Sequence, residues 1–180
     1  MSKRVLCLLA PGLEEIETIT PVDLLRRAGA EVVMASVTGE EFVKGRSEIT
    51  IRADASIEDS ADVNYDLLLI PGGPGVKALR EDGRAAQLAM AYAEAGKLIG
   101  AICAAPTILA DAGLLTGKRF TAHSSVHGEL PQALGGKRVV EDGNVITSRG
   151  AGTALDFGLA LVKRLFGDDK ASEVAASIMA

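Results

Sequence analysis

Residues 97–106 read Lys-Leu-Ile-Gly-Ala-Ile-Cys-Ala-Ala-Pro, and this stretch decides the fold. Leu98 to Ile102 form a short apolar run that is typical of a buried strand, and a helical pattern resumes directly after it. Pro106 stands where a helix accepts proline, in its first turn. Cys103 therefore falls on a sharp turn between strand and helix. We predict a nucleophile elbow, which presents a cysteine to the free amide groups at a helix N-terminus.

Cys103 also has a plainer interpretation. Free cysteine is among the most buried residue types, and it packs as a small hydrophobic side chain in many cores. The sequence around the cysteine allows both interpretations, because its alanine neighbours suit a crowded bend and a core equally well. The choice between a catalytic and a core cysteine depends on which other residues the fold places at the same edge of the sheet.

Strand and helix patterns alternate along most of the chain, which predicts a mostly parallel sheet between two layers of helices. We expect a kink or a break at Pro21, because a proline inside a helix removes a hydrogen bond. Without a linker or an internal repeat, the sequence predicts one flavodoxin-like α/β domain over residues 1–180, a three-layer sandwich with the nucleophile elbow at its edge. The expected strands are 4–10, 31–37, 49–51, 65–70, 98–102, 120–122, 139–141 and 145–147, and the expected helices are 14–28, 87–95, 106–112, 153–166 and 170–178.

Composition narrows the class of function. The 180 residues are 48% hydrophobic, carry a net charge of −5 and include 4 Phe, 2 Tyr and no Trp. An acidic chain with so few aromatic side chains is unsuited to nucleic acid or to an anionic membrane. Two cysteines are too few for a disulfide framework, and no apolar run reaches the roughly 20 residues that span a bilayer. We expect a soluble protein of the reducing cytoplasm.

Four motifs fall at the carboxyl ends of the expected strands, where sheets of this type bind their ligands. Glycines let successive backbone N–H groups face a negative charge, although a glycine loop alone also fits a plain turn. We predict that the amides of Gly73 and Ala104 form an oxyanion hole, with Gly72 beside the substrate. The four motifs are 14–17, 72–75, Cys103 and 149–152.

Glu17 and His123 are the candidate partners of the cysteine. Carboxylates favour helix N-termini in general, but a buried carboxyl beside a thiolate keeps its proton and can return it to a substrate. His123, at the end of an expected strand, is a second candidate proton carrier, although a single histidine is often incidental. His127, with Glu129 two residues on, would suit a glutaminase triad but lies close to the cysteine. Two histidines on a loop are insufficient for a metal site, so we expect no metal.

Six segments together resemble the ThiJ/PfpI superfamily, and within it the DJ-one/YajL branch is the most similar. The resemblance implies a flavodoxin-like homodimer with its reactive cysteine at Cys103, its hydrogen-bonding acid at Glu17, its histidine at His123 and its oxyanion amides at Gly73 and Ala104. The segments are Ala-Pro-Gly-Leu-Glu-Glu-Ile-Glu-Thr at 10–18, Pro-Val-Asp-Leu-Leu-Arg-Arg-Ala-Gly at 21–29, Asp-Ala-Ser-Ile-Glu-Asp at 54–59, Pro-Gly-Gly at 71–73, Gly-Ala-Ile-Cys-Ala-Ala-Pro at 100–106 and Thr-Ser-Arg-Gly-Ala-Gly-Thr at 147–153.

The resemblance also carries expectations about activity. Members of this branch are described as glutathione-independent glyoxalases, as deglycases of early methylglyoxal and glyoxal adducts, and as oxidation sensors or chaperones of the stress response. It therefore implies small 2-oxoaldehydes or glycated adducts as substrates, no cofactor, and nucleic acid at most as a glycated substrate. The alternative is a sensor or holdase chaperone read through oxidation of Cys103. Peptidase relatives have histidine where this chain has Ala104, which argues against a peptidase and leaves a glutaminase-like amidohydrolase as a third hypothesis.

Overall fold

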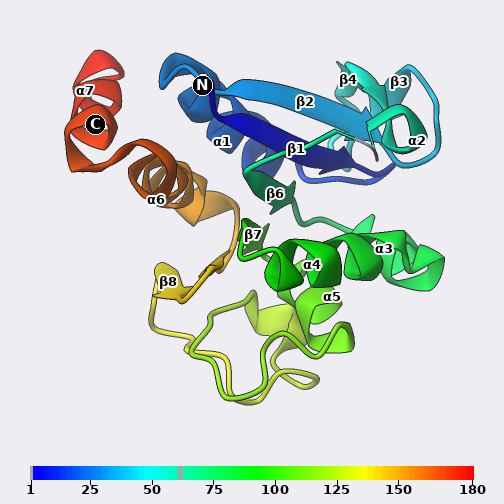
Figure 1. The fold of residues 1–180 in the computed structure, drawn as a ribbon. Helices are drawn as coiled ribbons and strands as arrows, with labels where there is room; N and C mark the ends of the chain where they lie inside the picture. The colour runs from blue at the N-terminus through cyan, green and yellow to red at the C-terminus, as the bar shows by residue number, and fades with distance from the viewer. Residues whose placement is uncertain (1, 61–62) are drawn as a thin grey trace.

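A seven-stranded sheet lies at the centre of the computed structural model, which describes residues 2–60 and 63–180 (Figure 1). Its order is β5-β2-β1-β6-β7-β9-β8, and all neighbours are parallel except β8, which pairs antiparallel with β9 at one edge. This arrangement confirms the predicted flavodoxin-like α/β fold. The strands are β1 (Arg4–Leu9), β2 (Glu31–Ser36), β5 (Ala55–Ser56), β6 (Leu67–Ile70), β7 (Leu98–Ile102), β8 (Val139–Asp142) and β9 (Val145–Ser148).

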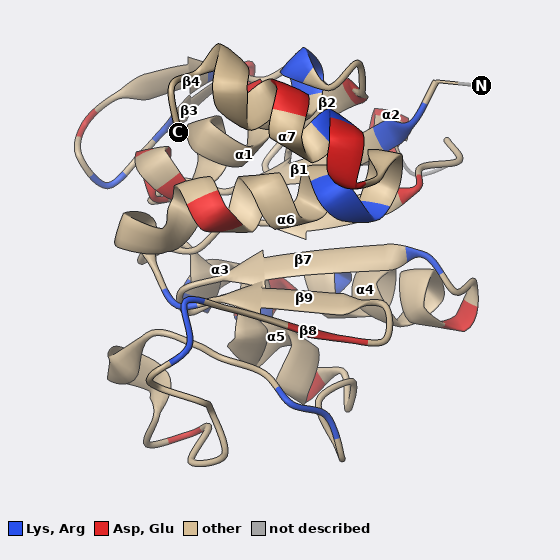
Figure 2. Ribbon diagram, turned by 90° about the vertical axis from the view of Figure 1, so that its left-hand side faces the viewer, with Lys and Arg blue, Asp and Glu red and all other residues tan. Residues whose placement is uncertain are grey.

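Helices cover both faces of this sheet (Figures 1 and 2). One core lies under α1, α6 and α7, and the other lies under α3, α4 and α5. Within the described ranges, no helix combines the length and the apolar character needed to cross a membrane. The helices are α1 (Glu15–Arg27), α2 (Ile57–Ser60), α3 (Val76–Asp82), α4 (Arg84–Glu94), α5 (Pro106–Asp111), α6 (Ala154–Phe166) and α7 (Asp168–Ser177), with 3₁₀-helices η1 (Ser124–Val126) and η2 (Ala151–Thr153).

The first strand shows why the central strands are apolar throughout. Val5, Cys7 and Leu9 belong to the core beneath α1 and α6, whereas Leu6 and Leu8 belong to the core on the other face. Successive side chains of a strand point to opposite faces, so a strand covered on both sides must be apolar at every position. Burial of each such leucine stabilises the fold by about 1.5–3 kcal/mol.

Helix α1 continues through Pro21 without a break, which corrects the predicted interruption. Pro21 lies where α1 packs against α6 at Gly158. A Cβ atom added to Gly158 would lie 3.1 Å from the Cα atom of Pro21 and 2.5 Å from Cδ1 of Leu24. A side chain at position 158 would crowd this approach. Packing against α6 therefore holds the helix across a residue that lowers its intrinsic stability.

The predicted strand at 120–122 is wrong, because side chains replace the backbone ladder there. The N–H of Thr121 donates to Oγ1 of Thr147 at 2.9 Å, and the Thr121 hydroxyl donates to the carbonyl of Leu134 at 2.9 Å. The segment is therefore extended but is not part of the sheet. Its position still matters, since it leads into His123 at the carboxyl edge.

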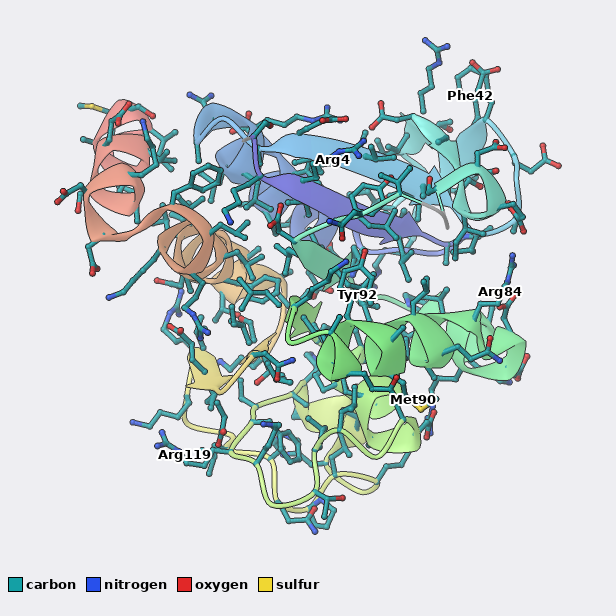
Figure 3. All side chains as sticks on the ribbon, viewed as in Figure 1. Arg4, Phe42, Arg84, Met90, Tyr92 and Arg119 are labelled. Carbon is teal, nitrogen blue, oxygen red and sulfur yellow. The ribbon has the colours of Figure 1, made fainter. Side chains whose placement is uncertain are left out.

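A small hairpin, β3 (Phe42–Lys44) and β4 (Thr50–Arg52), stands apart from the main sheet. Only its second strand is predicted by the sequence. Figure 3 shows Phe42 on its outer side, where the residue is 60% exposed. The hairpin is tied to the turn after β1, because the N–H of Gly12 donates to Lys44 and the N–H of Arg46 donates to Leu13. These bonds bring Arg46 to the edge where the candidate site lies.

Candidate active site

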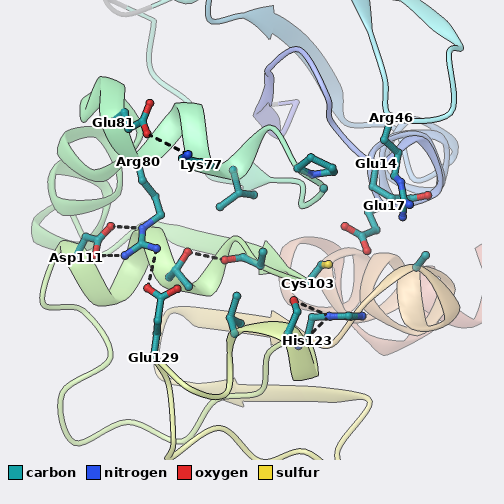
Figure 4. Close-up of a pocket in the computed structure, with 18 residues that line it drawn as sticks. Glu14, Glu17, Arg46, Lys77, Arg80, Glu81, Cys103, Asp111, His123 and Glu129 are labelled. Carbon is teal, nitrogen blue, oxygen red and sulfur yellow. Dashed lines mark hydrogen bonds and ion pairs between the residues drawn. The ribbon is translucent and has the colours of Figure 1, made fainter.

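A pocket with a volume of about 880 Å³ opens at the carboxyl edge of the sheet (Figure 4). Its lining includes all five residues that the sequence analysis assigned to proton transfer, nucleophilic attack and oxyanion binding. Glu17 comes from α1, and Gly73 comes from the loop between β6 and α3. Cys103 and Ala104 follow β7, and His123 precedes η1. The structure thus brings these residues together, and their chemical roles stay predictions.

Cys103 has a backbone conformation that is unusual for any residue except glycine. Its φ angle is 66°, in the left-handed region, which costs other residues roughly 1–2 kcal/mol. Two backbone hydrogen bonds of 2.9 Å hold it there: its N–H donates to Ser148, and its carbonyl accepts from the N–H of His123. The sheet therefore imposes the sharp turn of a nucleophile elbow, which lifts the sulfur toward the pocket.

The two glycines that face the cysteine leave no room for side chains. A Cβ atom on Gly72 would lie 2.5 Å from Cβ of Cys103 and would also collide with Oε2 of Glu17. Gly73 has a φ angle of 101°, and a Cβ atom there would lie 2.6 Å from the backbone nitrogen of Glu14. With both side chains absent, the N–H groups of Gly73 and Ala104 approach the sulfur and act to lower the pKa of Cys103.

Glu17 is a buried acid on the first turn of α1. The residue is 1% exposed, and its backbone N–H donates to the Glu14 side chain at 2.8 Å, which caps the helix. Its Oε2 atom is buried and has no hydrogen-bond partner among the described residues. Burial raises the pKa of Glu17 to about 7; the polar contact with Cys103 acts to lower it, and the charge of Glu14 to raise it. Such a carboxyl retains its proton near neutral pH.

The pKa of Cys103 is also raised, chiefly by burial and then by the negative charge of Glu17, and these outweigh the Gly73 and Ala104 amides. The start of α5 favours a thiolate, as the sequence predicts, but burial and the charge of Glu17 act more strongly on the thiol. Two acids in contact titrate as a pair. The pair loses one proton near pH 7 and holds the second far more tightly. The first proton therefore leaves Glu17, and transfer of the retained proton from the sulfur to the unpartnered Oε2 of Glu17 gives the thiolate.

His123 caps the short helix η1 instead of ending a strand, which corrects its predicted setting. Its Nδ1 atom accepts the backbone N–H of Ser125 at 3.2 Å and lies 2.9 Å from the Ser125 hydroxyl. A backbone N–H can only donate, so this contact assigns the proton of the neutral imidazole to Nε2. Ser125 also lines the pocket, and its position two residues after the histidine was the sequence signal for this cap.

The predicted pairing of His127 with Glu129 is wrong. Nε2 of His127 lies 3.1 Å from the carbonyl oxygen of Ala122, and His127 lines a separate pocket. Glu129 instead accepts a hydrogen bond from Arg80 at 2.8 Å. A histidine oriented by this glutamate is therefore absent, and the glutaminase hypothesis loses the motif on which it rested.

Charged residues that the sequence analysis did not single out form much of the remaining wall. Arg46 comes from the β3–β4 turn, Lys77 and Arg80 from α3, and Asp111 from the end of α5. No motif marks them, because they are separated in sequence and only the fold brings them together. Across residues 2–60 and 63–180, no group of three or more His, Cys, Asp or Glu side chains is arranged to hold a metal ion.

Comparisons with known proteins identify the family of the chain. The DJ-1/PfpI family profile matches residues 3–164. The chain is 42% identical to the protein dj-1beta of Drosophila melanogaster, over 99% of this chain and 98% of the relative, and the crystal structure of that protein superposes with a TM-score of 0.96.

Two further relatives bear on the chemistry. The chain is 36% identical to the glutathione-independent glyoxalase DJR-1.2 of Caenorhabditis elegans, over 96% of this chain and 94% of the relative. It is 35% identical to a solved structure of oxidized Toxoplasma gondii DJ-1, which covers 99% of this chain and 98% of the other, with a TM-score of 0.93. The chain belongs to the DJ-1/PfpI family.

Proposed function

We propose that this protein is a glutathione-independent glyoxalase and deglycase, which acts on methylglyoxal, glyoxal and their early adducts through Cys103. The observation that carries the proposal is one pocket that holds both a strained, partly accessible cysteine and a buried acid whose pKa is raised to about 7. The relative named as a glyoxalase supports the same reaction class.

The first step is attack on a carbonyl. The sulfur of Cys103 bonds to the aldehyde carbon of methylglyoxal, and the negative charge that develops on oxygen is stabilised by the N–H groups of Gly73 and Ala104. Glu17 supplies a proton to that oxygen, which gives a hemithioacetal. With an early adduct, the sulfur bonds to the former aldehyde carbon while the bond from that carbon to the amine or thiol breaks, and the leaving group takes the proton from Glu17.

The second step moves hydrogen within the substrate. Glu17, now ionised, removes the proton from the carbon bonded to sulfur, and Nε2–H of His123 hydrogen-bonds the neighbouring carbonyl as the enediol forms. Return of the proton to the adjacent carbon gives a thioester. Water then hydrolyses the thioester, which releases a 2-hydroxy acid and restores the thiol. One carbon is oxidised while its neighbour is reduced, so the reaction requires no external oxidant and no cofactor.

Turnover of methylglyoxal to lactate tests this proposal. We expect lactate from the unmodified protein and none above background from Cys103→Ser, whereas Cys7→Ala should retain turnover because Cys7 is fully buried in β1. Glu17→Gln should lose most of the activity, since the amide cannot accept the carbon-bound proton. Equal lactate production by Cys103→Ser and the unmodified protein would exclude the mechanism.

A redox sensor or holdase chaperone is the second candidate function. Protonated Oε2 of Glu17 could donate to a sulfinate on Cys103 as it does to a thiolate, and the Toxoplasma gondii relative was solved in an oxidized form. Mild peroxide should then add about 32 Da to Cys103 and leave Cys7 unmodified. Loss of lactate turnover at low protein concentration, with full retention of peroxide sensitivity, would favour this function over catalysis.

Assembly and location belong to the same proposal. Ile16 and Ile19 of α1 and Leu155 of α6 are apolar and at least 40% exposed, on two helices that pack together. We expect this face to be covered in a homodimer, which sedimentation of Ile16→Glu would test by its shift to a monomer. Two free cysteines suit the reducing cytoplasm, and localisation of a tagged chain tests that assignment.

A further inference from the structure

Hydrogen bonds link Arg80, Asp111 and Glu129 at the end of the pocket that lies away from Glu17 (Figure 4). Arg80 donates from Nε and Nη2 to the two carboxylate oxygens of Asp111 at 2.7 and 2.9 Å, and from Nη1 to Glu129 at 2.8 Å. A guanidinium that binds one carboxylate through two of its nitrogens and a second carboxylate through the third has a fixed orientation as well as a fixed position.

Each of the three residues belongs to a segment that begins with a group of the candidate site. Arg80 is on α3, whose first turn bonds back to Gly73 through the N–H of Val76 at 3.1 Å. Asp111 ends α5, the helix that starts just beyond Cys103 and Ala104. Glu129 follows η1, which His123 caps. The guanidinium therefore joins the three segments that supply the Gly73 amide, the Ala104 amide and the imidazole.

The sheet does not fix these three segments equally. Cys103 follows β7, which has sheet neighbours on both sides. Helix α3 has seven residues and no side-chain cap at its start, and the segment around Glu129 lies between η1 and β8 without a strand or a long helix. Backbone hydrogen bonds from Glu14 to Gly72 and from His123 to Cys103 hold the ends of these segments at the site, so it is their far ends that need a tertiary connection. The hydrogen bonds from Arg80 to Asp111 and Glu129 connect the far ends of both segments to the end of α5.

We propose that Arg80 is a positioning residue, which holds the Gly73 amide and His123 at working distance from Cys103 through its bonds to Asp111 and Glu129. The kinetic consequence rests on the proposed glyoxalase function, but the effect on the sulfur does not. If the Gly73 amide moves away, the thiol loses one of the two donors that lower its pKa. The reactivity of Cys103 then reports the position of the amide without any substrate.

Two measurements on the full-length protein test this proposal. The variants are Arg80→Ala, Arg80→Lys and Asp111→Asn. The matched control is Arg164→Lys. The side chain of Arg164 is also 31% exposed. It links α6 to the β8–β9 hairpin through Glu141 and Gly143, away from the pocket. The first measurement is the pH profile of Cys103 alkylation by iodoacetamide, and the second is kcat and KM for methylglyoxal.

We expect the alkylation profile of Arg80→Ala to move to higher pH and kcat to fall about tenfold or more, with KM within about twofold, because small displacements of aligned groups reduce rate more than binding. Arg80→Lys, which retains one ion pair, should recover part of both. An unchanged profile in folded Arg80→Ala, or the same change in Arg164→Lys, would overturn the proposal. If Arg80→Ala does not fold, Asp111→Asn decides by the same criteria. A shifted profile in a protein that makes no lactate would reject the glyoxalase function and leave the positioning role intact.

Discussion

Replacement of Glu17 by glutamine should remove the effect of pH on stability at this site. Glu17 is 1% exposed, and burial raises its pKa from the ordinary 4.5 to about 7. Between these two pH values the folded protein keeps a proton that the unfolded chain has lost. The free energy of unfolding therefore falls as pH rises through this interval, and below it the carboxyl makes no difference.

The magnitude follows from the two pKa values. At about 1.4 kcal/mol for each pKa unit, ionising this carboxyl in the folded state costs about 3 kcal/mol at alkaline pH. Glutamine has nearly the same shape and cannot ionise. We therefore expect Glu17→Gln to gain up to about 3 kcal/mol relative to the unmodified protein as pH rises from about 5 to about 8.

Urea unfolding at several pH values measures this difference directly, provided that the m-value is unchanged. Glu81→Gln is a suitable control, because Glu81 lines the same pocket but its side chain is 69% exposed. A gap between Glu17→Gln and the unmodified protein that stays constant with pH, or that narrows as pH rises, would refute the reasoning about the buried carboxyl.

Three further predictions follow from the same geometry. The kcat/KM for methylglyoxal should rise about tenfold per pH unit up to a break near pH 7, because the reactive pair must first lose one proton; a flat stopped-flow profile between about pH 5 and 8 would contradict this. Gly72→Ala should unfold at lower urea concentration, by about 1–3 kcal/mol, and lose turnover, because its Cβ atom would lie 2.5 Å from that of Cys103; unaltered stability and activity would show that the loop can yield. Cys103→Gly should be about 1 kcal/mol more stable than Cys103→Ala, since glycine accepts a φ angle of 66°, and calorimetry that ranks them in the opposite order would argue against strain at the elbow.

The features that the sequence predicted are those encoded by neighbouring residues. An apolar run followed by Cys103, small residues and Pro106 is a local pattern, so β7, the turn and α5 were placed correctly. Periodicity likewise located β1, β2, α4 and α6. Glu17 and Gly73 could be assigned to the site because strand ends converge in such a sheet.

What the sequence did not predict depends on tertiary contacts. Pro21 remains inside a helix that packs against α6 at Gly158, and nothing near Pro21 in the sequence indicates this contact. The segment at 120–122 forms no strand, because the backbone N–H of Thr121 donates to the side chain of Thr147. Arg80 and Asp111 are 31 residues apart, and no motif links them. The direction of the Cys103 pKa was also missed, since the sequence shows the favourable amides but not the burial that outweighs them.

The pattern of destabilising features is itself an argument for catalysis. Cys103 holds a left-handed backbone that glycine would adopt more easily, and Glu17 holds a carboxyl where glutamine would avoid the cost of ionisation. Both features lie at one point, where Oε2 of Glu17 lacks a partner. A fold selected for stability alone would contain neither, because each costs about 1–3 kcal/mol. The combination of Cys103→Gly with Glu17→Gln should therefore be more stable than Cys103→Ala at alkaline pH and wholly inactive. If the double variant proved less stable than Cys103→Ala, neither feature would be a cost, and strain at this point would not indicate function.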